Sequence, residues 1–227
     1  MNVSLYDFAE DKFLKKVMIK EQMERIYRDI PLDAIPWNIA TPSEILVTAV
    51  TANITKKCKA IEMGCGAGNY VIYFSKLGYD CAGLDISENA IRIARNMALA
   101  AGAKCKFIVA DVTGDLSECN STFDFVYDWE LLHHIFPEDR EKYINNVDRL
   151  LNSNGRYLSV CFSEDSPQFG GSGKYRKTPL GTVLYLSSEK ELELLFKKRF
   201  VICELKTIDV KGKNIAHKAI YVFMKKK

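Results

Sequence analysis

The sequence predicts an α/β protein with a doubly wound, mostly parallel sheet and helices on both of its faces. Between residues 59 and 162, short apolar runs alternate with helical stretches, which is the pattern of such a sheet. A glycine-rich turn follows the first apolar run. Four successive runs also end at or beside an acid, namely Glu62, Asp85, Asp111 and Asp128. Because ligands bind beyond the carboxyl ends of the strands in these sheets, we expect the acids to meet at one site.

Length and composition fit one globular domain spanning residues 1–227. The 227 residues are 48% hydrophobic and 27% charged. The net charge is +3, and the one evident basic cluster, Lys225–Lys227, reads as a solvated tail, so no nucleic-acid partner is expected. No apolar run approaches the ~20 residues of a membrane span, and the N-terminus lacks a signal-peptide pattern. We therefore expect a cytoplasmic protein without a membrane partner.

The seven cysteines include no Cys-x-x-Cys pair, and several fall inside predicted strands. We interpret them as buried thiols in a reducing compartment. Neither a disulfide framework nor a metal site is expected.

The N-terminal segment, residues 1–40, is predicted to form a helix followed by a lid. Apolar residues recur at helical spacing up to residue 30, and Pro31 and Pro36 then interrupt the pattern. The loop that follows carries Trp37. This side chain either plugs the core or forms a wall of the ligand site.

The next elements follow in order along the chain. Thr41 with Glu44 predicts a capped helix that ends near Ala52. Ser87 predicts the cap of a helix that ends before Gly102, and Pro137 opens another. Asn154-Gly155 predicts a turn. The predicted strands are 59–63, 80–84, 107–110, 123–127 and 156–162.

After the fifth strand the alternation stops. Residues 163–186 are too rich in apolar and aromatic side chains for a plain linker, and we expect this insertion to cover the rim of the site. Ser188 and Glu191 predict a capping box at the start of a core-facing helix. Residues 200–208 and 218–224 predict a closing antiparallel hairpin.

The glycine-rich turn carries Gly64, Gly66 and Gly68 on alternate positions. Glycines permit a tight turn and let a ligand lie directly against the main chain. The nicotinamide-binding pattern Gly-x-Gly-x-x-Gly is not met, because Asn69 stands where its third glycine would fall. A glycine-rich turn without a ligand remains the other interpretation of this stretch alone.

Taken together, the motifs between residues 41 and 224 resemble those of class I S-adenosylmethionine-dependent methyltransferases. Residues 62–68 resemble the first motif of the family, residues 83–87 the second and residues 110–112 the third. Residues 123–128, followed by Leu131-Leu132-His133-His134, resemble the fourth. The resemblance implies a Rossmann-like sheet of seven strands in the order 3-2-1-4-5-7-6, with the last strand antiparallel.

The resemblance also implies a site for S-adenosylmethionine, with S-adenosylhomocysteine as product. It implies that Asp85 binds the ribose hydroxyls and that Asp111 lies near the adenine amino group. Glu62 and Asp128 can attract the cationic amino-acid end and the sulfonium region. The implied cofactor site consists of Trp37, Glu62, Gly64, Cys65, Gly66, Gly68, Asp85, Ile86, Asp111, Val112 and Asp128.

The acceptor site is expected where the fourth strand ends, near Asp128, Trp129 and Glu130. His133 and Asp128 are the catalytic candidates. Adjacent helical residues point about 100° apart, so at most one of His133 and His134 faces the site, and we favour His133. Pro36-Trp37 resembles the thiopurine, halide and thiol methyltransferase group, which implies a small, soft nucleophile as acceptor.

Other functions stay open at this point. A regulator or pseudoenzyme would keep the cofactor site without turnover. A nucleic-acid or protein methyltransferase is a further alternative, although the Asn/Asp-Pro-Pro-aromatic motif of amino-group chemistry is absent from residues 128–131. We expect a monomer or a homodimer.

Overall fold

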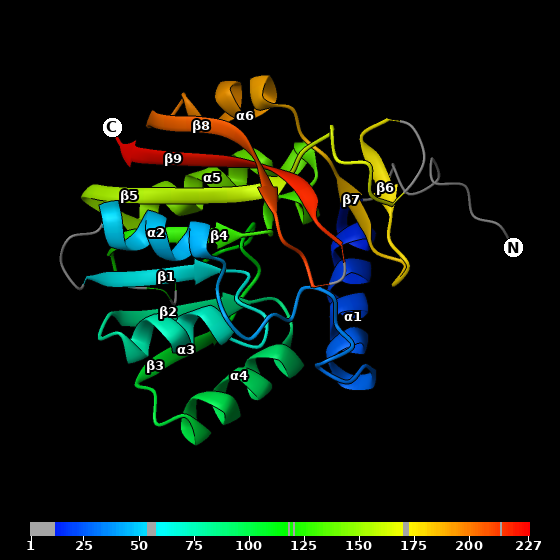
Figure 1. Cartoon of the computed structure of the whole chain (residues 1–227), viewed down its shortest axis with the longest axis vertical. Coiled ribbons are helices and arrows are strands. Elements are labelled where there is room, and N and C mark those ends of the chain that lie inside the picture. Colours follow the sequence, from blue (N-terminus) through cyan, green and yellow to red (C-terminus); the bar gives the residue numbers. More distant parts are fainter. Residues whose placement is uncertain (1–11, 54–57, 118, 120, 170–172, 214) are drawn as a thin grey trace, which may run out of the picture.

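The alternating strands and helices form a seven-stranded sheet in the order β3-β2-β1-β4-β5-β9-β8 (Figure 1). The computed structural model describes residues 12–53, 58–117, 119, 121–169, 173–213 and 215–227. β1 to β5 are parallel neighbours, whereas β9 is antiparallel to both β5 and β8. When only the seven strands of this sheet are numbered in chain order, β8 and β9 become strands 6 and 7. The observed order is then the predicted 3-2-1-4-5-7-6, so the predicted fold class is confirmed.

The sheet strands are β1 (Lys59–Met63), β2 (Asp80–Asp85), β3 (Cys105–Val109), β4 (Phe123–Trp129), β5 (Leu151–Phe162), β8 (Phe200–Val210) and β9 (His217–Lys226). The helices are α1 (Lys12–Asp29), α2 (Glu44–Asn53), α3 (Asn69–Lys76), α4 (Glu88–Ala100), α5 (Pro137–Leu150) and α6 (Glu189–Phe196), with a short 3-10 turn, η2 (Leu132–His134).

Helices cover both faces of the sheet. Buried side chains of α2, α3 and α4 form one apolar cluster with one face, and those of α5 and α6 form a second cluster with the other. The largest fully buried side chains include Tyr127, Tyr143 and Tyr157. Burying apolar area at roughly 25 cal/mol per Å² is the main stabilisation of such a layered core. None of the helices in the described ranges is long and apolar enough to cross a membrane.

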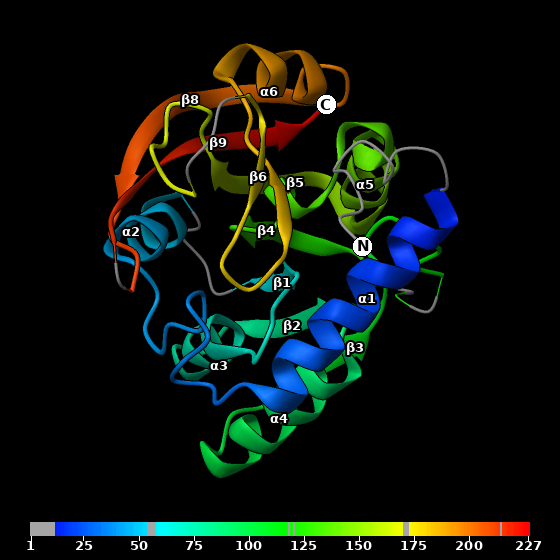
Figure 2. The ribbon, with the colours of Figure 1, turned by 90° about the vertical axis from the view of Figure 1, so that its right-hand side faces the viewer.

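The N-terminal helix α1 crosses the edge of the sheet at which β1, β2 and β4 end (Figure 2). The Glu24 carboxylate fixes it there, because it accepts hydrogen bonds from the Ser87 hydroxyl and from the backbone N–H of Glu88 and Asn89 at the start of α4. The part of the predicted N-terminal helix before Lys12 lies outside the described residues.

The insertion 163–186 contains a small hairpin of β6 (Tyr175–Lys177) and β7 (Val183–Tyr185). It contacts α1, where the Gln22 side-chain amide donates to the Leu180 carbonyl at 3.4 Å. Gly170–Ser172 of this insertion lie outside the described residues.

Several predicted element ends are confirmed. The Ser87 hydroxyl accepts from the Ala90 N–H at 3.1 Å, and Ser188 with Glu191 forms the predicted capping box. Gly102 follows α4 with φ of 63°.

Two local predictions are wrong. Ser43, not Thr41, caps α2, because its hydroxyl accepts from the Leu46 N–H at 3.2 Å. Asn154-Gly155 does not end an element but lies inside β5, where the pairing with β4 shifts register between Phe123 and Phe125. The turn-forming residues are accommodated by this irregularity, so the strand starts at Leu151 instead of Arg156.

Candidate functional site

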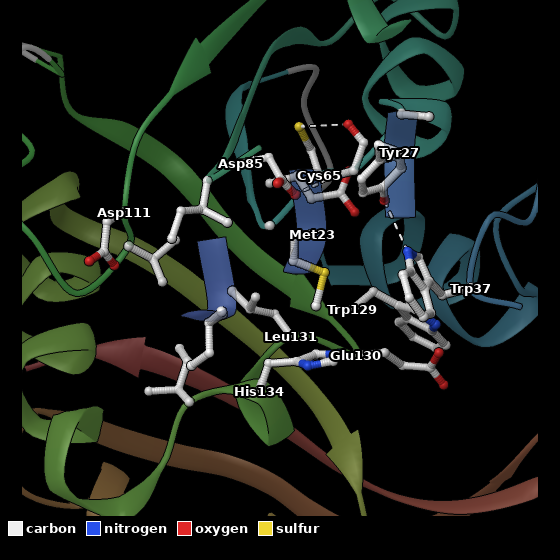
Figure 3. A pocket seen from close by; sticks show the side chains of 18 of the residues that line it. Met23, Tyr27, Trp37, Cys65, Asp85, Asp111, Trp129, Glu130, Leu131 and His134 are labelled. Atoms are coloured by element: carbon white, nitrogen blue, oxygen red, sulfur yellow. Dashed lines mark hydrogen bonds between the residues drawn. The ribbon is translucent and has the colours of Figure 1, made fainter. Parts of the chain in front are cut away.

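A pocket lies beyond the carboxyl ends of β1, β2 and β4, as the fold class predicts (Figure 3). Its floor is the glycine loop with the residues that follow β2, β3 and β4. Its outer wall comes from the N-terminal segment, through Ile19, Met23 and Tyr27 of α1 and residues 37–39. Most predicted cofactor residues line it: Trp37, Glu62, Gly64, Cys65, Gly66, Asp85, Ile86, Asp111 and Val112.

The glycine loop brings the main chain to the pocket surface. Gly64 and Gly66 have φ of 71° and 52°, a region that favours glycine. A Cβ atom on Gly64 would lie 2.6 Å from a Leu131 methyl carbon, and one on Gly66 would overlap the Tyr27 hydroxyl. Gly68 differs from the prediction. It packs against Phe107 and Ala94 and begins α3, so it supports the loop without lining the pocket.

Asp85 ties the glycine loop to the end of β2. Its carboxylate accepts from the Gly66 N–H and from the Ser87 N–H, both at 2.9 Å. The side chain is buried, and this burial raises its pKa above the ordinary value. A buried carboxylate held at the pocket wall is suited to accept hydroxyl donors from a ligand.

Glu62 and Asp111 bring further carboxylates to the pocket. Burial raises the pKa of Glu62 well above its ordinary value, while the Tyr127 hydroxyl donates to it at 3.2 Å and opposes this effect. Asp111 accepts from both the backbone N–H and the hydroxyl of Thr113, at 2.8 Å each. These contacts hold the Asp111 side chain in place beside Val112.

The acidic side chains that line the pocket are not balanced by lysine or arginine in its described lining. Of its described lining residues, five are carboxylates and none is a lysine or an arginine; the acids are Glu62, Asp85, Asp111, Glu130 and Asp139. Clustered carboxylates repel one another unless a cation is present. The lining therefore fits a cationic ligand and opposes a phosphate-bearing one, which disfavours the nicotinamide alternative.

Asp128 is not at the pocket, contrary to the prediction. It is fully buried beneath it and accepts hydrogen bonds from Tyr143 at 2.8 Å, Tyr157 at 2.5 Å and Ser159 at 3.1 Å. Side chains alternate along a strand, so Asp128 points to the α5 side and its neighbour Trp129 to the pocket. Glu130 lies beyond the end of the strand and also lines the pocket. Asp128 joins α5 to β4 and β5.

Replacing Asp128 by asparagine tests this structural role. Burial raises the pKa of Asp128 from 3.8 to about 6, so the folded state binds this proton more tightly than the unfolded state. The wild-type protein therefore loses up to about 3 kcal/mol of unfolding free energy from this group as the pH rises from 4 to 8. In urea titrations, Asp128→Asn should gain that amount relative to wild type across the same range.

Asp124→Asn, an exposed position on the same strand, is the matched control and should not reproduce the pH-dependent gain. A stability difference between Asp128→Asn and wild type that stays constant from pH 4 to 8 would contradict the assignment.

His134, and not His133 as predicted, is the histidine that faces the pocket. His134 lines the pocket, and its ring meets Trp37 edge-on at 6.3 Å between centroids. His133 is buried behind it, where its Nδ1 accepts from the Phe162 N–H at 3.4 Å. Burial lowers the pKa of His134 to about 4, so this ring is neutral and weakly basic at physiological pH.

Trp37 forms a wall of the pocket, the second of its two interpretations. Its indole N–H donates to the Tyr27 hydroxyl at 2.9 Å, drawn as a dashed line in Figure 3. Three backbone carbonyls of the same segment accept from Lys213, those of Asp33, Ile35 and Asn38. The segment is thus held by α1 on one side and by the β8–β9 turn on the other.

Two features of the site were missed from the sequence. The α1 side chains Met23 and Tyr27 line the pocket, although their helical spacing was recognised only as a helix signal. His217, at the start of β9, hydrogen-bonds through Nε2 to the pocket residue Glu130. No local pattern marks this pair, because its members are 87 positions apart in the sequence. Within the described ranges, no group of three or more His, Cys, Asp or Glu side chains could hold a metal ion.

Comparison with known proteins adds family information to this geometry. Residues 60–155 match the family model described as a methyltransferase domain. A carboxy-S-adenosyl-L-methionine synthase of Campylobacter concisus (strain 13826) is 34% identical over 114 residues, which is 49% of this chain and 46% of that protein. A probable thiol methyltransferase 2 of Arabidopsis thaliana is 25% identical over 140 residues, 60% of this chain and 61% of that protein.

Solved structures share the whole fold. A protein studied for the conversion of a disulfide bond into a thioacetal group during echinomycin biosynthesis superposes with a TM-score of 0.77 at 21% identity. The match covers 92% of this chain and 93% of that one. By contrast, the chain spans about half the length of the first curated relatives that it matches.

Proposed function

Because the chain carries a methyltransferase domain of the class I fold, we propose that it binds S-adenosylmethionine and transfers the methyl group to a small-molecule acceptor. The observation that carries the proposal is the composition of the pocket. A glycine loop is combined with five acids, of which Glu62, Asp85 and Asp111 lie at strand ends, and with no lysine or arginine among the described lining. S-adenosylmethionine is a cation without phosphate, which matches this lining.

The pocket residues divide the ligand between them. Asp85 accepts hydrogen bonds from the ribose hydroxyls, and Asp111 and Val112 contact the adenine. Glu62 attracts the ammonium group of the amino-acid end, and the backbone at Gly64 and Gly66 lies against the ligand. When bound, S-adenosylmethionine supplies a methyl group on a positively charged sulfur that leaves as a neutral thioether.

The N-terminal segment acts as the lid. Tyr27, joined to Trp37, closes the pocket over the glycine loop and excludes water from it. The main contribution of the protein is orientation, which can supply roughly 7–11 kcal/mol in a well-aligned displacement. The insertion 163–186 supports the lid from outside through Leu180, and its Tyr175 ring packs on the pocket residue Phe136. None of its described residues lines the pocket.

A soft nucleophile such as a thiol is the finer prediction for the acceptor. It is supported by the Pro36-Trp37 resemblance and by the similarity to the Arabidopsis protein at 25% identity. A cytoplasmic location and a monomeric or homodimeric state also remain predictions.

Transfer of labelled methyl from S-adenosylmethionine tests the proposal. The purified chain should label a small acceptor from a panel of thiols, phenols, amines and iodide. Binding of S-adenosylmethionine without labelling of any acceptor would favour the regulator or pseudoenzyme alternative. Specific labelling of RNA, DNA or protein instead would overturn the small-molecule assignment.

A further inference from the structure

Glu130 has a backbone conformation that its side chain does not favour. It follows the last residue of β4 and has φ of 65°, in the left-handed region that costs most non-glycine residues about 1–3 kcal/mol. Its N–H donates to the Val160 carbonyl at 2.7 Å, which fixes this geometry. With this backbone conformation Glu130 does not continue β4, and it lines the pocket.

His217 holds the Glu130 carboxylate from behind. Its Nε2 is hydrogen-bonded to Glu130 Oε1, and its ring packs on Phe162 with 4.3 Å between centroids. Both side chains are largely buried, with exposed fractions of 5% for His217 and 13% for Glu130. Because the His217 contact engages Oε1, the second oxygen of Glu130 is left to receive a proton.

The pair lies at one end of the pocket. In Figure 3, Asp111 is at the opposite side, whereas Trp37, Trp129 and His134 surround the Glu130 end. The aromatic rings provide flat apolar walls there.

We propose that Glu130 is the catalytic base of the transfer and that His217 is its positioning residue. Because a base is needed only where the acceptor carries a proton, the acceptor is a neutral molecule with an ionisable N–H, O–H or S–H group. This inference rests on the proposed methyl transfer. The acceptor lone pair forms the new bond to the methyl carbon, and the electron pair of the breaking C–S bond goes to sulfur. The acceptor proton goes to the Glu130 carboxylate.

The charge of the pocket points to the same class of acceptor. An anion such as a halide would enter a site whose described lining has five acidic side chains and no lysine or arginine. Such like charges are unfavourable in a buried site. A neutral acceptor avoids this cost and loses its proton only as the new bond forms.

A series of thiophenols and phenols of different acidity tests the inference with Glu130→Gln. General-base catalysis typically contributes 10²–10⁴-fold, so kcat/KM should fall about 100-fold for acceptors that are protonated at the assay pH. For acceptors that are already ionised, such as 4-nitrothiophenol, kcat/KM should stay constant or rise, because the variant removes a negative charge. The affinity for S-adenosylmethionine, measured by calorimetry, should change less than about twofold.

Two further variants separate positioning from folding. His217→Gln keeps a side-chain N–H donor and should retain most activity on protonated acceptors, whereas His217→Leu should lose it with the same dependence on acceptor acidity as Glu130→Gln. Glu193→Gln, on the exposed face of α6, is the control for a change of the same chemistry outside the site.

Failure of the base assignment and failure of the proposed methyl transfer give different results. An equal loss on all acceptors, or weakened binding of S-adenosylmethionine by Glu130→Gln, would overturn the base assignment. The absence of labelled product from wild type with every acceptor would instead overturn the proposed function, and the inference with it.

Discussion

Asp85→Ala is expected to weaken binding of S-adenosylmethionine by at least about tenfold. A hydrogen bond to a charged group contributes roughly 1.5–3 kcal/mol, and every 1.4 kcal/mol is a factor of ten in affinity. Asp85 also fixes the glycine loop through the Gly66 N–H, so its loss removes a ligand contact and loosens the wall beside it. Isothermal titration of the variant with S-adenosylmethionine measures the effect.

Asp80→Ala is the matched control for Asp85→Ala. Asp80 is an exposed residue at the other end of the same strand, far from the pocket. Its replacement should leave the affinity within about twofold of wild type. Equal affinities for Asp85→Ala and wild type would show that the ribose contact is wrongly assigned.

Gly66→Ala is expected to abolish measurable binding and to destabilise the fold. The added methyl group would overlap the Tyr27 hydroxyl, and alanine at φ of 52° is strained by roughly 1–2 kcal/mol. Because Tyr27 is joined to Trp37, the clash displaces the lid from the glycine loop. Thermal unfolding and calorimetric titration measure the two consequences separately.

Gly102→Ala isolates the backbone strain from the clash. Its φ is 63°, and a Cβ atom there would have no neighbour within 4 Å. Gly102→Ala should lower the free energy of unfolding by a similar amount, because its backbone is similarly strained, and it should keep full affinity for S-adenosylmethionine. In the double variant Tyr27→Phe/Gly66→Ala, removal of the hydroxyl leaves a carbon at 3.5 Å, so part of the affinity should return. No recovery in the double variant, or equal binding losses in Gly66→Ala and Gly102→Ala, would argue against a lid that rests on Gly66.

The fold could be predicted because its signals are local and repeated. Strand–helix alternation and the cap residues Ser87 and Ser188 each depend on a few neighbouring residues. The exceptions are instructive. At residues 41–44, both Thr41 and Ser43 have a hydroxyl that can cap a helix, and Ser43 is the cap because α2 begins at Glu44. The dipeptide Asn154-Gly155 falls in the part of β5 that the pairing with β4 skips, between Leu151 and Arg156, so the strand accommodates it without ending.

The acids of the site were predictable where strand ends define their positions. Glu62, Asp85 and Asp111 reach the pocket because the carboxyl ends of parallel strands share one edge. The same reasoning gave a wrong position for Asp128, because β4 continues to Trp129. Asp128 therefore lies within the strand and points to the face that α5 covers. The choice between His133 and His134 depends on the direction of a single 3-10 turn, which the sequence does not determine. His217 reaches Glu130 only through the position of β9 in the sheet.

Calorimetric titration of the wild-type chain with S-adenosylmethionine, and in parallel with NAD⁺, tests the central claim most directly. The acidic pocket predicts one site for S-adenosylmethionine with a Kd in the micromolar range, about −8 kcal/mol. It predicts no detectable heat with NAD⁺, whose phosphates would meet carboxylates and no lysine or arginine in the described lining. Absence of binding by S-adenosylmethionine, or tighter binding of NAD⁺, would contradict the account.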